Sequence, residues 1–315
     1  HGYNTAIGTY ALLSQNAGTD AHNTAIGYST GQAITTGAYN TIIGAYTGDA
    51  LTTGADNVAM GYAALSTEDA HGKNVAIGNY ALQDQDAGAD AYNVAIGYNA
   101  GKEVTTGKET VLIGGNAGLA LTTGIRNVAI GHAALQTEDE HGYNVAVGNR
   151  ALQNLNAGAD GYNVAVGSNA GQSVTTGTSN TLVGGLAGDA LTVGDNNIAV
   201  GRSALSAETQ GDRNVAIGNF ALRDQNNTSN TDSYNVAVGY AAGASITTAI
   251  NNTFIGSLAG DAILTGSNNT ALGYAALSAA NGDEQYNVAI GSGSLMNLDG
   301  SGDMWNTAVG TNSGL

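Results

Sequence analysis

The chain has 315 residues, with 48 Gly, no Pro, no Cys, and a net charge of −17 from 8 Lys and Arg against 25 Asp and Glu. The absence of Cys excludes a disulfide framework and thiol chemistry. A polyanion repels nucleic acid and anionic lipid, and no apolar run is long enough to span a bilayer, so we expect neither nucleic-acid binding nor membrane insertion.

The dominant pattern is a five-residue motif, Asn-(Val/Thr)-Ala-(Ile/Val)-Gly, that recurs eighteen times with small variations. Its starts fall at residues 4, 23, 40, 57, 74, 93, 110, 127, 144, 163, 180, 197, 214, 235, 252, 269, 287 and 306. Most steps are 17 residues, which is too short to enclose a core, so each repeat must be one coil of a solenoid stabilised by its neighbours. We predict about 18 coils of 17–19 residues in one continuous array over residues 1–315.

Within a coil, the elements can be followed over residues 93–109. Residues 93–96 predict a short β-strand because Asn93 is followed by a β-branched, a small and a β-branched residue, and Gly97 ends it. A second short strand is predicted at residues 104–106, closed by Gly107. Two strands and two turns per coil describe an all-β fold, a flattened parallel β-solenoid or β-roll. The absence of Pro agrees with this fold, because Pro cannot donate to a β-ladder.

A longer period is superimposed on the coils. Starts at residues 4, 74 and 144 are 70 residues apart, which defines a four-coil super-repeat. In the third coil of each cycle, the third motif residue is bulky instead of Ala; these residues are Ile42, Leu112, Leu182 and Phe254. The cycle indicates duplication of a four-coil block.

The strand is apolar on both faces. Its third and fourth motif residues point to opposite sides, yet both are apolar, and a strand of this kind is buried on both faces. One face fills the coil and the other needs a partner, which we expect to be another copy of the chain. We assign the self-association face to the third motif residues Ala6, Ala25, Ile42, Ala76, Ala95, Leu112, Leu182 and Phe254. The alternative is that a row of Ala is simply exposed.

The motif also carries a resemblance. Asn-Val-Ala-Ile-Gly followed by Ala and Gly resembles the head repeats of trimeric autotransporter adhesins. The 17-residue spacing, with residues 23–28 and 35–37, resembles arrays in phage tail-fibre-type proteins. This resemblance covers the whole chain and implies a left-handed β-roll, assembled as a homotrimer on a virion or cell surface. The longer coils and the four-coil cycle depart from the adhesin pattern.

Two sets of surface residues are candidate binding residues. Aromatic rings precede the motif in one coil of each cycle, at Tyr92, Tyr162, Tyr234 and Trp305. Such rings beside polar groups are typical of sugar-contacting surfaces, although they can equally pack on neighbouring coils. Thr pairs recur as well, and a regular Thr array is typical of ice-binding solenoids. The Thr candidates are Thr35, Thr52, Thr105, Thr122 and Thr175, whose alternative role is to flank turns.

No group of residues indicates catalysis, so we expect no enzymatic activity and no cofactor. His71 and His141 are equivalent by repeat and lie four coils apart, so one chain cannot gather them around a metal ion. Residues 68–69 and 138–140 are acidic, and weak Ca²⁺ binding is one interpretation of them. They lack the alternating Asp/Gly pattern of calcium-binding rolls, so we predict solvated loops. We therefore predict no metal site.

The sequence favours a structural and adhesive shaft of an extracellular fibre that mediates attachment. Its expected partners are further copies of itself, side by side or end to end, and a host surface glycan or protein receptor. The alternatives are a monomeric ice-binding or polysaccharide-binding solenoid, and a self-assembling filament subunit.

Overall fold

The computed structural model describes residues 2–278, 282–298, 300 and 302–314. The chain divides into two compact units, residues 1–161 and 162–315, and each is described by itself. The first unit contains β1 (Thr5–Ile7), β2 (Thr24–Ile26), β3 (Thr41–Ile43), β4 (Val58–Met60), β5 (Val75–Ile77), β6 (Val94–Ile96), β7 (Val111–Ile113), β8 (Val128–Ile130) and β9 (Val145–Val147). The second contains β10 (Val164–Val166), β11 (Thr181–Val183), β12 (Ile198–Val200), β13 (Val215–Ile217), β14 (Val236–Val238), β15 (Thr253–Ile255), β16 (Thr270–Leu272), β17 (Val288–Ile290) and β18 (Thr307–Val309).

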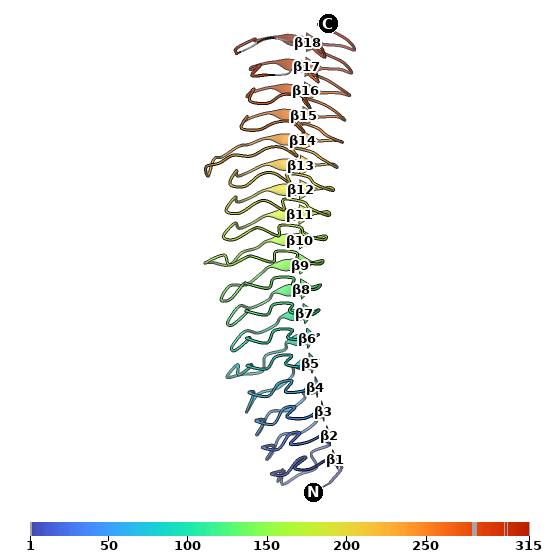
Figure 1. The fold of residues 1–315 in the computed structure, drawn as a ribbon, viewed down its shortest axis with the longest axis vertical. Helices are drawn as coiled ribbons and strands as arrows, with labels where there is room; N and C mark the ends of the chain where they lie inside the picture. Colours follow the sequence, from blue (N-terminus) through green and yellow to red (C-terminus); the bar gives the residue numbers. More distant parts are fainter. Residues whose placement is uncertain (1, 279–281, 299, 301, 315) are drawn as a thin grey trace. The chain divides into compact units, whose positions relative to one another are not determined.

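Each unit is a stack of coils that contribute one strand each (Figure 1). Within a unit every strand pairs in parallel and in register with the next, so that Ala76 of β5 lies opposite Ala95 of β6. The predicted parallel β-solenoid, with about 18 coils of about 17 residues and no helix among the described residues, is therefore confirmed.

The predicted second strand is wrong. Thr105 is hydrogen-bonded to the next coil, but residues 104–106 form no strand. The backbone N–H groups of Thr105 and Gly107 both donate to the carbonyl of Thr122, at 2.9 and 3.1 Å. Two donors that converge on one acceptor turn the chain instead of extending a ladder.

The middle residue of each strand points into the coil. The predicted self-association residues Ala25, Ile42, Ala76, Ala95, Leu112, Leu182 and Phe254 are all completely buried in the single chain. Ala6 is exposed because β1 has a neighbouring strand on one side only. These side chains fill the solenoid's own core and cannot meet another copy, so the assignment of the contact face is wrong. The first and last residues of each strand point outward instead.

The four-coil cycle is a pattern of alternate core filling. A Cβ added to Gly101 would lie 2.5 Å from Leu112 Cδ1, and one added to Gly118 would lie 2.7 Å from Leu112 Cδ2. The bulky side chain of β7 therefore occupies the volume left by glycine in its own coil and in the preceding one. Other coils carry a buried Leu at the glycine position, as Leu82 and Leu135 do, and keep Ala in the strand.

The Asn residues that begin the motif hold the coils together. Asn180 is representative: its Oδ1 accepts the backbone N–H of Asn197 in the next coil at 2.9 Å. Its Nδ2 donates to the carbonyl of Gly194 at the end of the same coil, at 2.8 Å. The Asn180 amide thus closes its own coil and joins it to the next.

Candidate functional site

The first candidate surface is the outer strand face, which we define as the first and last residues of the strands in one unit. In-register pairing places these side chains in two rows, one of Val, Ile or Thr and one of Ile, Val, Met or Leu. They are partly covered by their neighbours above and below, so that Met60 is 37% exposed and Ile217 is 39% exposed. Each unit therefore presents an apolar, β-branched surface.

Among the described residues of each unit, no other strand or helix covers this surface. Parallel sheets are normally buried on both faces, and soluble monomers rarely expose contiguous apolar patches beyond a few hundred Å². The outer strand face therefore has the chemistry of a surface that another molecule covers.

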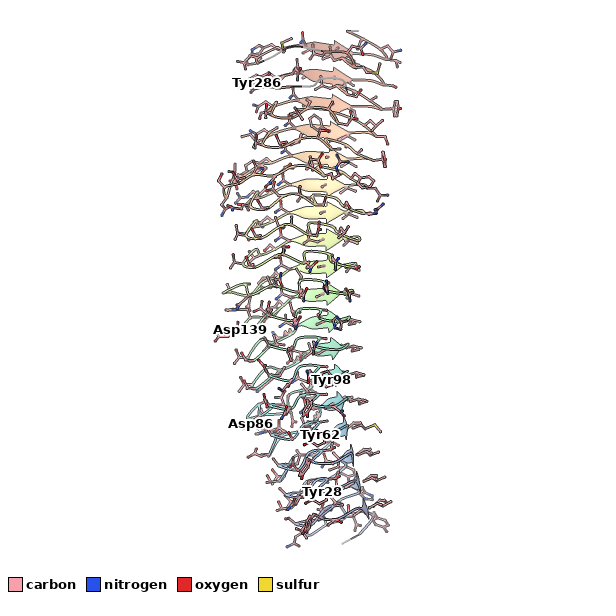
Figure 2. All side chains as sticks on the ribbon, in the orientation of Figure 1. Tyr28, Tyr62, Asp86, Tyr98, Asp139 and Tyr286 are labelled. Atoms are coloured by element: carbon pink, nitrogen blue, oxygen red, sulfur yellow. The ribbon has the colours of Figure 1, made fainter. Side chains whose placement is uncertain are left out.

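A ladder of tyrosines follows the strands of the first unit. Tyr10, Tyr28, Tyr46, Tyr62, Tyr80 and Tyr98 lie in six consecutive coils, and each ring meets the next edge to face with centroids 5.4–6.1 Å apart. Figure 2 labels three of them, Tyr28, Tyr62 and Tyr98. The ladder was not predicted, because Tyr alternates between the first and second residues after the motif Gly. That alternation over six coils is the signal that would have found it.

The predicted aromatic column is not gathered into one site. Tyr92, Tyr162, Tyr234 and Trp305 are all at least half exposed. Lys73 lies over the Tyr92 ring at 5.1 Å, and Arg213 lies over the Tyr234 ring at 5.7 Å. Trp305 stacks on Tyr286 with centroids 4.2 Å apart. These rings contact neighbouring coils, as the alternative interpretation held, and a role in sugar binding stays a prediction.

The predicted Thr array is engaged within the solenoid. The hydroxyl of Thr35 donates to the carbonyl of Thr52 at 3.1 Å, and that of Thr122 donates to the carbonyl of Asp139 at 2.7 Å. The same inter-coil bond is made by Thr52, Thr105 and Thr175. These hydroxyl groups join successive coils, so they do not form a free hydroxyl surface.

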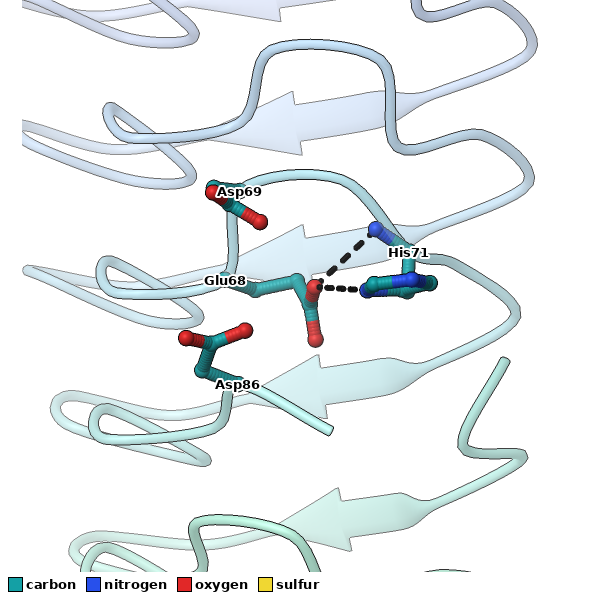
Figure 3. A group of neighbouring side chains, drawn as sticks. All are labelled: Glu68, Asp69, His71 and Asp86. Atoms are coloured by element: carbon teal, nitrogen blue, oxygen red, sulfur yellow. Dashed lines mark hydrogen bonds and ion pairs between the residues drawn. The ribbon is translucent and has the colours of Figure 1, made fainter. Parts of the chain in front are cut away.

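The acidic residues near His71 form a compact cluster (Figure 3). Glu68 is completely buried, which corrects the expectation of a solvated loop. It lies at the core position that Leu51 occupies in the preceding coil. Its Oε1 accepts the His71 backbone N–H at 3.0 Å and lies 3.5 Å from the ring Nδ1. One ligand atom from each of Glu68, Asp69, His71 and Asp86 lies within 4.8 Å of the others.

A related cluster occurs one cycle later. Glu138 is completely buried, its Oε1 accepts the His141 backbone N–H at 3.2 Å, and Asp139 completes a group of three within 4.8 Å. Burial raises the pKa of both Glu68 and Glu138, and the N–H groups of His71 and His141 partly offset this effect. The spacing Glu-Asp-x-His, which both clusters share, is the sequence signal for them, and comparing the histidines only with one another does not find it.

Comparison with known proteins gives no assignment: no family model matches the chain, and no related protein of curated function was found. The resemblance to adhesin and tail-fibre repeats therefore depends on the motif and its spacing alone. Within the described ranges, we find no helix with the length and hydrophobicity needed to cross a membrane.

Proposed function

We propose that this chain is a structural, self-associating solenoid that serves as a shaft segment of an extracellular attachment fibre. The observation that carries the proposal is the outer strand face, whose last strand residue is apolar in all eighteen coils. In the proposed assembly, three copies pack through these faces. The threefold arrangement and the place on a virion or cell surface come from the resemblance of the motif.

The nature of the surface favours a second copy of the chain as its cover. Burying apolar surface contributes roughly 25 cal/mol per Å². A partner can cover the whole length of a row only if its own side chains repeat at the same spacing. Another copy of the same in-register stack has that spacing, whereas a globular protein does not.

An attachment role follows from the repetition. Each coil presents similar side chains, so contacts with a host glycan or protein receptor are made many times, and weak contacts add through avidity. The tyrosine ladder and the aromatic column offer exposed rings for such contacts. No catalytic step, cofactor or nucleic acid is part of this proposal.

The mass in solution tests the proposal. Light scattering after size exclusion should give three times the chain mass of 31.3 kDa. The paired substitution Ile77→Arg and Ile96→Arg places two cations on the outer strand face of β5 and β6 and should shift the mass toward one chain. The matched control is Thr36→Arg with Thr106→Arg, at exposed positions away from the strands, which should leave the mass unchanged. A wild-type mass of one chain would overturn the trimer.

A monomeric polysaccharide-binding solenoid is the second candidate, and the tyrosine ladder is the observation that favours it. If the wild-type chain is a monomer, glycan binding that is lost on Tyr28→Ala with Tyr62→Ala would establish this function. A mass that grows continuously with concentration would instead indicate a filament subunit.

A further inference from the structure

We propose that Glu68, Asp69, His71 and Asp86 form a binding site for a divalent transition-metal cation of the zinc type. We call this group the Glu68 cluster. The ligands would be the three carboxylates and His71 Nδ1. This inference does not depend on the oligomeric state or on the fibre function.

The first argument is a buried carboxylate oxygen without a partner. Glu68 lies in the core column of the solenoid, where the corresponding residues Leu51 and Leu121 are apolar. Its Oε2 is buried and accepts no hydrogen bond, and His71 Nδ1 is likewise buried without a hydrogen-bond partner. An unpaired carboxylate oxygen in such a place is costly, and a bound cation would pair it. In Figure 3, the carboxylate of Asp86 points toward Glu68.

The second argument is an internal comparison with the third cycle, where Glu208 takes the place of Glu68. Its carboxylate is saturated by neutral donors. These donors are the backbone N–H groups of Thr209, Gln210, Gly211 and Asn227, and the side-chain amides of Gln225 and Asn227. The same fold can therefore satisfy a buried Glu at this position without a metal ion. It does so for Glu208, in a coil that has Gly211 at the position equivalent to His71.

The comparison with the surroundings of Glu208 also applies to the positions of Asp69 and Asp86. The corresponding residues beside Glu208 are Thr209 and Asn226, and the Thr209 hydroxyl donates to Asn226 Oδ1 at 2.9 Å. Two ionised carboxylates cannot form that bond and repel each other instead. Among the described residues, neither Asp69 nor Asp86 forms an ion pair with Lys or Arg. A bound cation would supply the positive charge that this group of carboxylates lacks.

The ligand types identify the class of cation. Ca²⁺ and Mg²⁺ prefer oxygen ligands alone, whereas Zn²⁺ binds imidazole nitrogen together with carboxylate oxygen and takes four ligands in a tetrahedron. The Glu68 cluster offers one nitrogen and three carboxylates. The cluster around Glu138 should bind more weakly, because Asn156 replaces Asp86 and leaves one carboxylate fewer.

Calorimetric titration of the full chain with zinc chloride near neutral pH tests the site. We expect one tight site per chain, followed by weaker binding. Asp86→Asn changes an exposed residue to the one found a cycle later, so the fold should be kept while the tight-site affinity falls at least about tenfold. His71→Ala should abolish the tight site, and His132→Ala, at an exposed histidine outside both clusters, should change nothing.

A thermal measurement provides a second readout. Zinc should raise the unfolding temperature of the wild-type chain and of His132→Ala, because a ligand that binds only the folded state stabilises it. It should raise that of His71→Ala much less. Equal zinc affinity in the wild type, Asp86→Asn and His71→Ala would overturn the proposal, as would calcium binding as tight as zinc.

Discussion

Three aspartates occupy the same place in the third coil of their cycles. Asp49, Asp189 and Asp261 each have a buried Oδ1 without a hydrogen-bond partner. Burial raises the pKa of all three carboxyl groups. The second cycle has Leu119 at this place, so an uncharged side chain is compatible with the coil.

The raised pKa values predict the pH dependence of stability. The folded state holds these protons more tightly than the unfolded state does, so the contribution to stability is complete below the ordinary aspartate value of 3.8. It is lost as the pH rises through the higher folded pKa. The triple variant Asp49→Asn, Asp189→Asn, Asp261→Asn should therefore unfold a few degrees higher than the wild type at neutral pH. Below the ordinary aspartate pKa it should differ little, and circular dichroism melts at both pH values would show this. An equal shift at both pH values would contradict the explanation.

At the scale of the element, the side chains of the motif Asn residues, which we call the Asn ladder, join successive coils in addition to the backbone hydrogen bonds. Asn180→Ala removes two buried hydrogen bonds and leaves the Asn197 N–H and the Gly194 carbonyl without partners. We expect a loss of about 2–4 kcal/mol in the free energy of unfolding, measured by chemical denaturation. Thr106→Ala, at an exposed position, should change it by less than about 0.5 kcal/mol. A similar small loss in both variants would mean that the ladder is not a source of stability.

The strands could be predicted from the sequence, but which of their side chains point into the core could not. The repeated motif located β5 and β6 and ended them at Gly78 and Gly97. Alternation shows that the middle and last strand residues point to opposite sides, yet it does not show which side is inside. The small interior of the coil determines which side faces inward. Its volume is shared between the middle strand residue and the Leu or Gly six residues later, such as Leu82 after Ala76. Ala therefore suits the interior, and the larger Ile stays outside.

The candidate site was predictable only in part. The aromatic column and the Thr pairs were found as sequence positions, but their contacts with neighbouring coils depend on the stacking. Glu68 was assigned to a solvated loop because it lies beside another acidic residue. Alignment of the coils places it in the same column as Leu51, and only the structure shows that this column is the core.

At the scale of the whole molecule, charge opposes the association of copies. Each copy has a net charge of −17, so assembly brings like charges closer together. The outer strand faces themselves contain no charged residue. Apolar burial therefore has to overcome a long-range repulsion that salt screens, because the Debye length falls from about 30 Å at 0.01 M to about 8 Å at 0.15 M.

We therefore expect salt to favour the assembled form. Light scattering at low protein concentration should show a larger fraction of trimer at about 0.15 M than at about 0.01 M salt. Assembly through ion pairs would give the opposite dependence. The substitution of outer-face Ile by Arg tests the apolar contact, and this salt series tests the charge, so the two measurements are independent.

The alternate core filling also limits how the gene can change in length. Unequal recombination between DNA repeats can remove any number of coils. Loss of residues 93–109 alone would remove Gly101 and bring Leu112 against Leu82, with no room for both side chains. Loss of residues 74–143 removes one entire cycle and puts Ala146 and Leu152 in the places of Ala76 and Leu82, so the strand residue and the Leu that fill the coil are of the same kind as before. Alleles of different length should therefore differ by whole cycles, because a protein that has lost other numbers of coils cannot pack the interior at the junction.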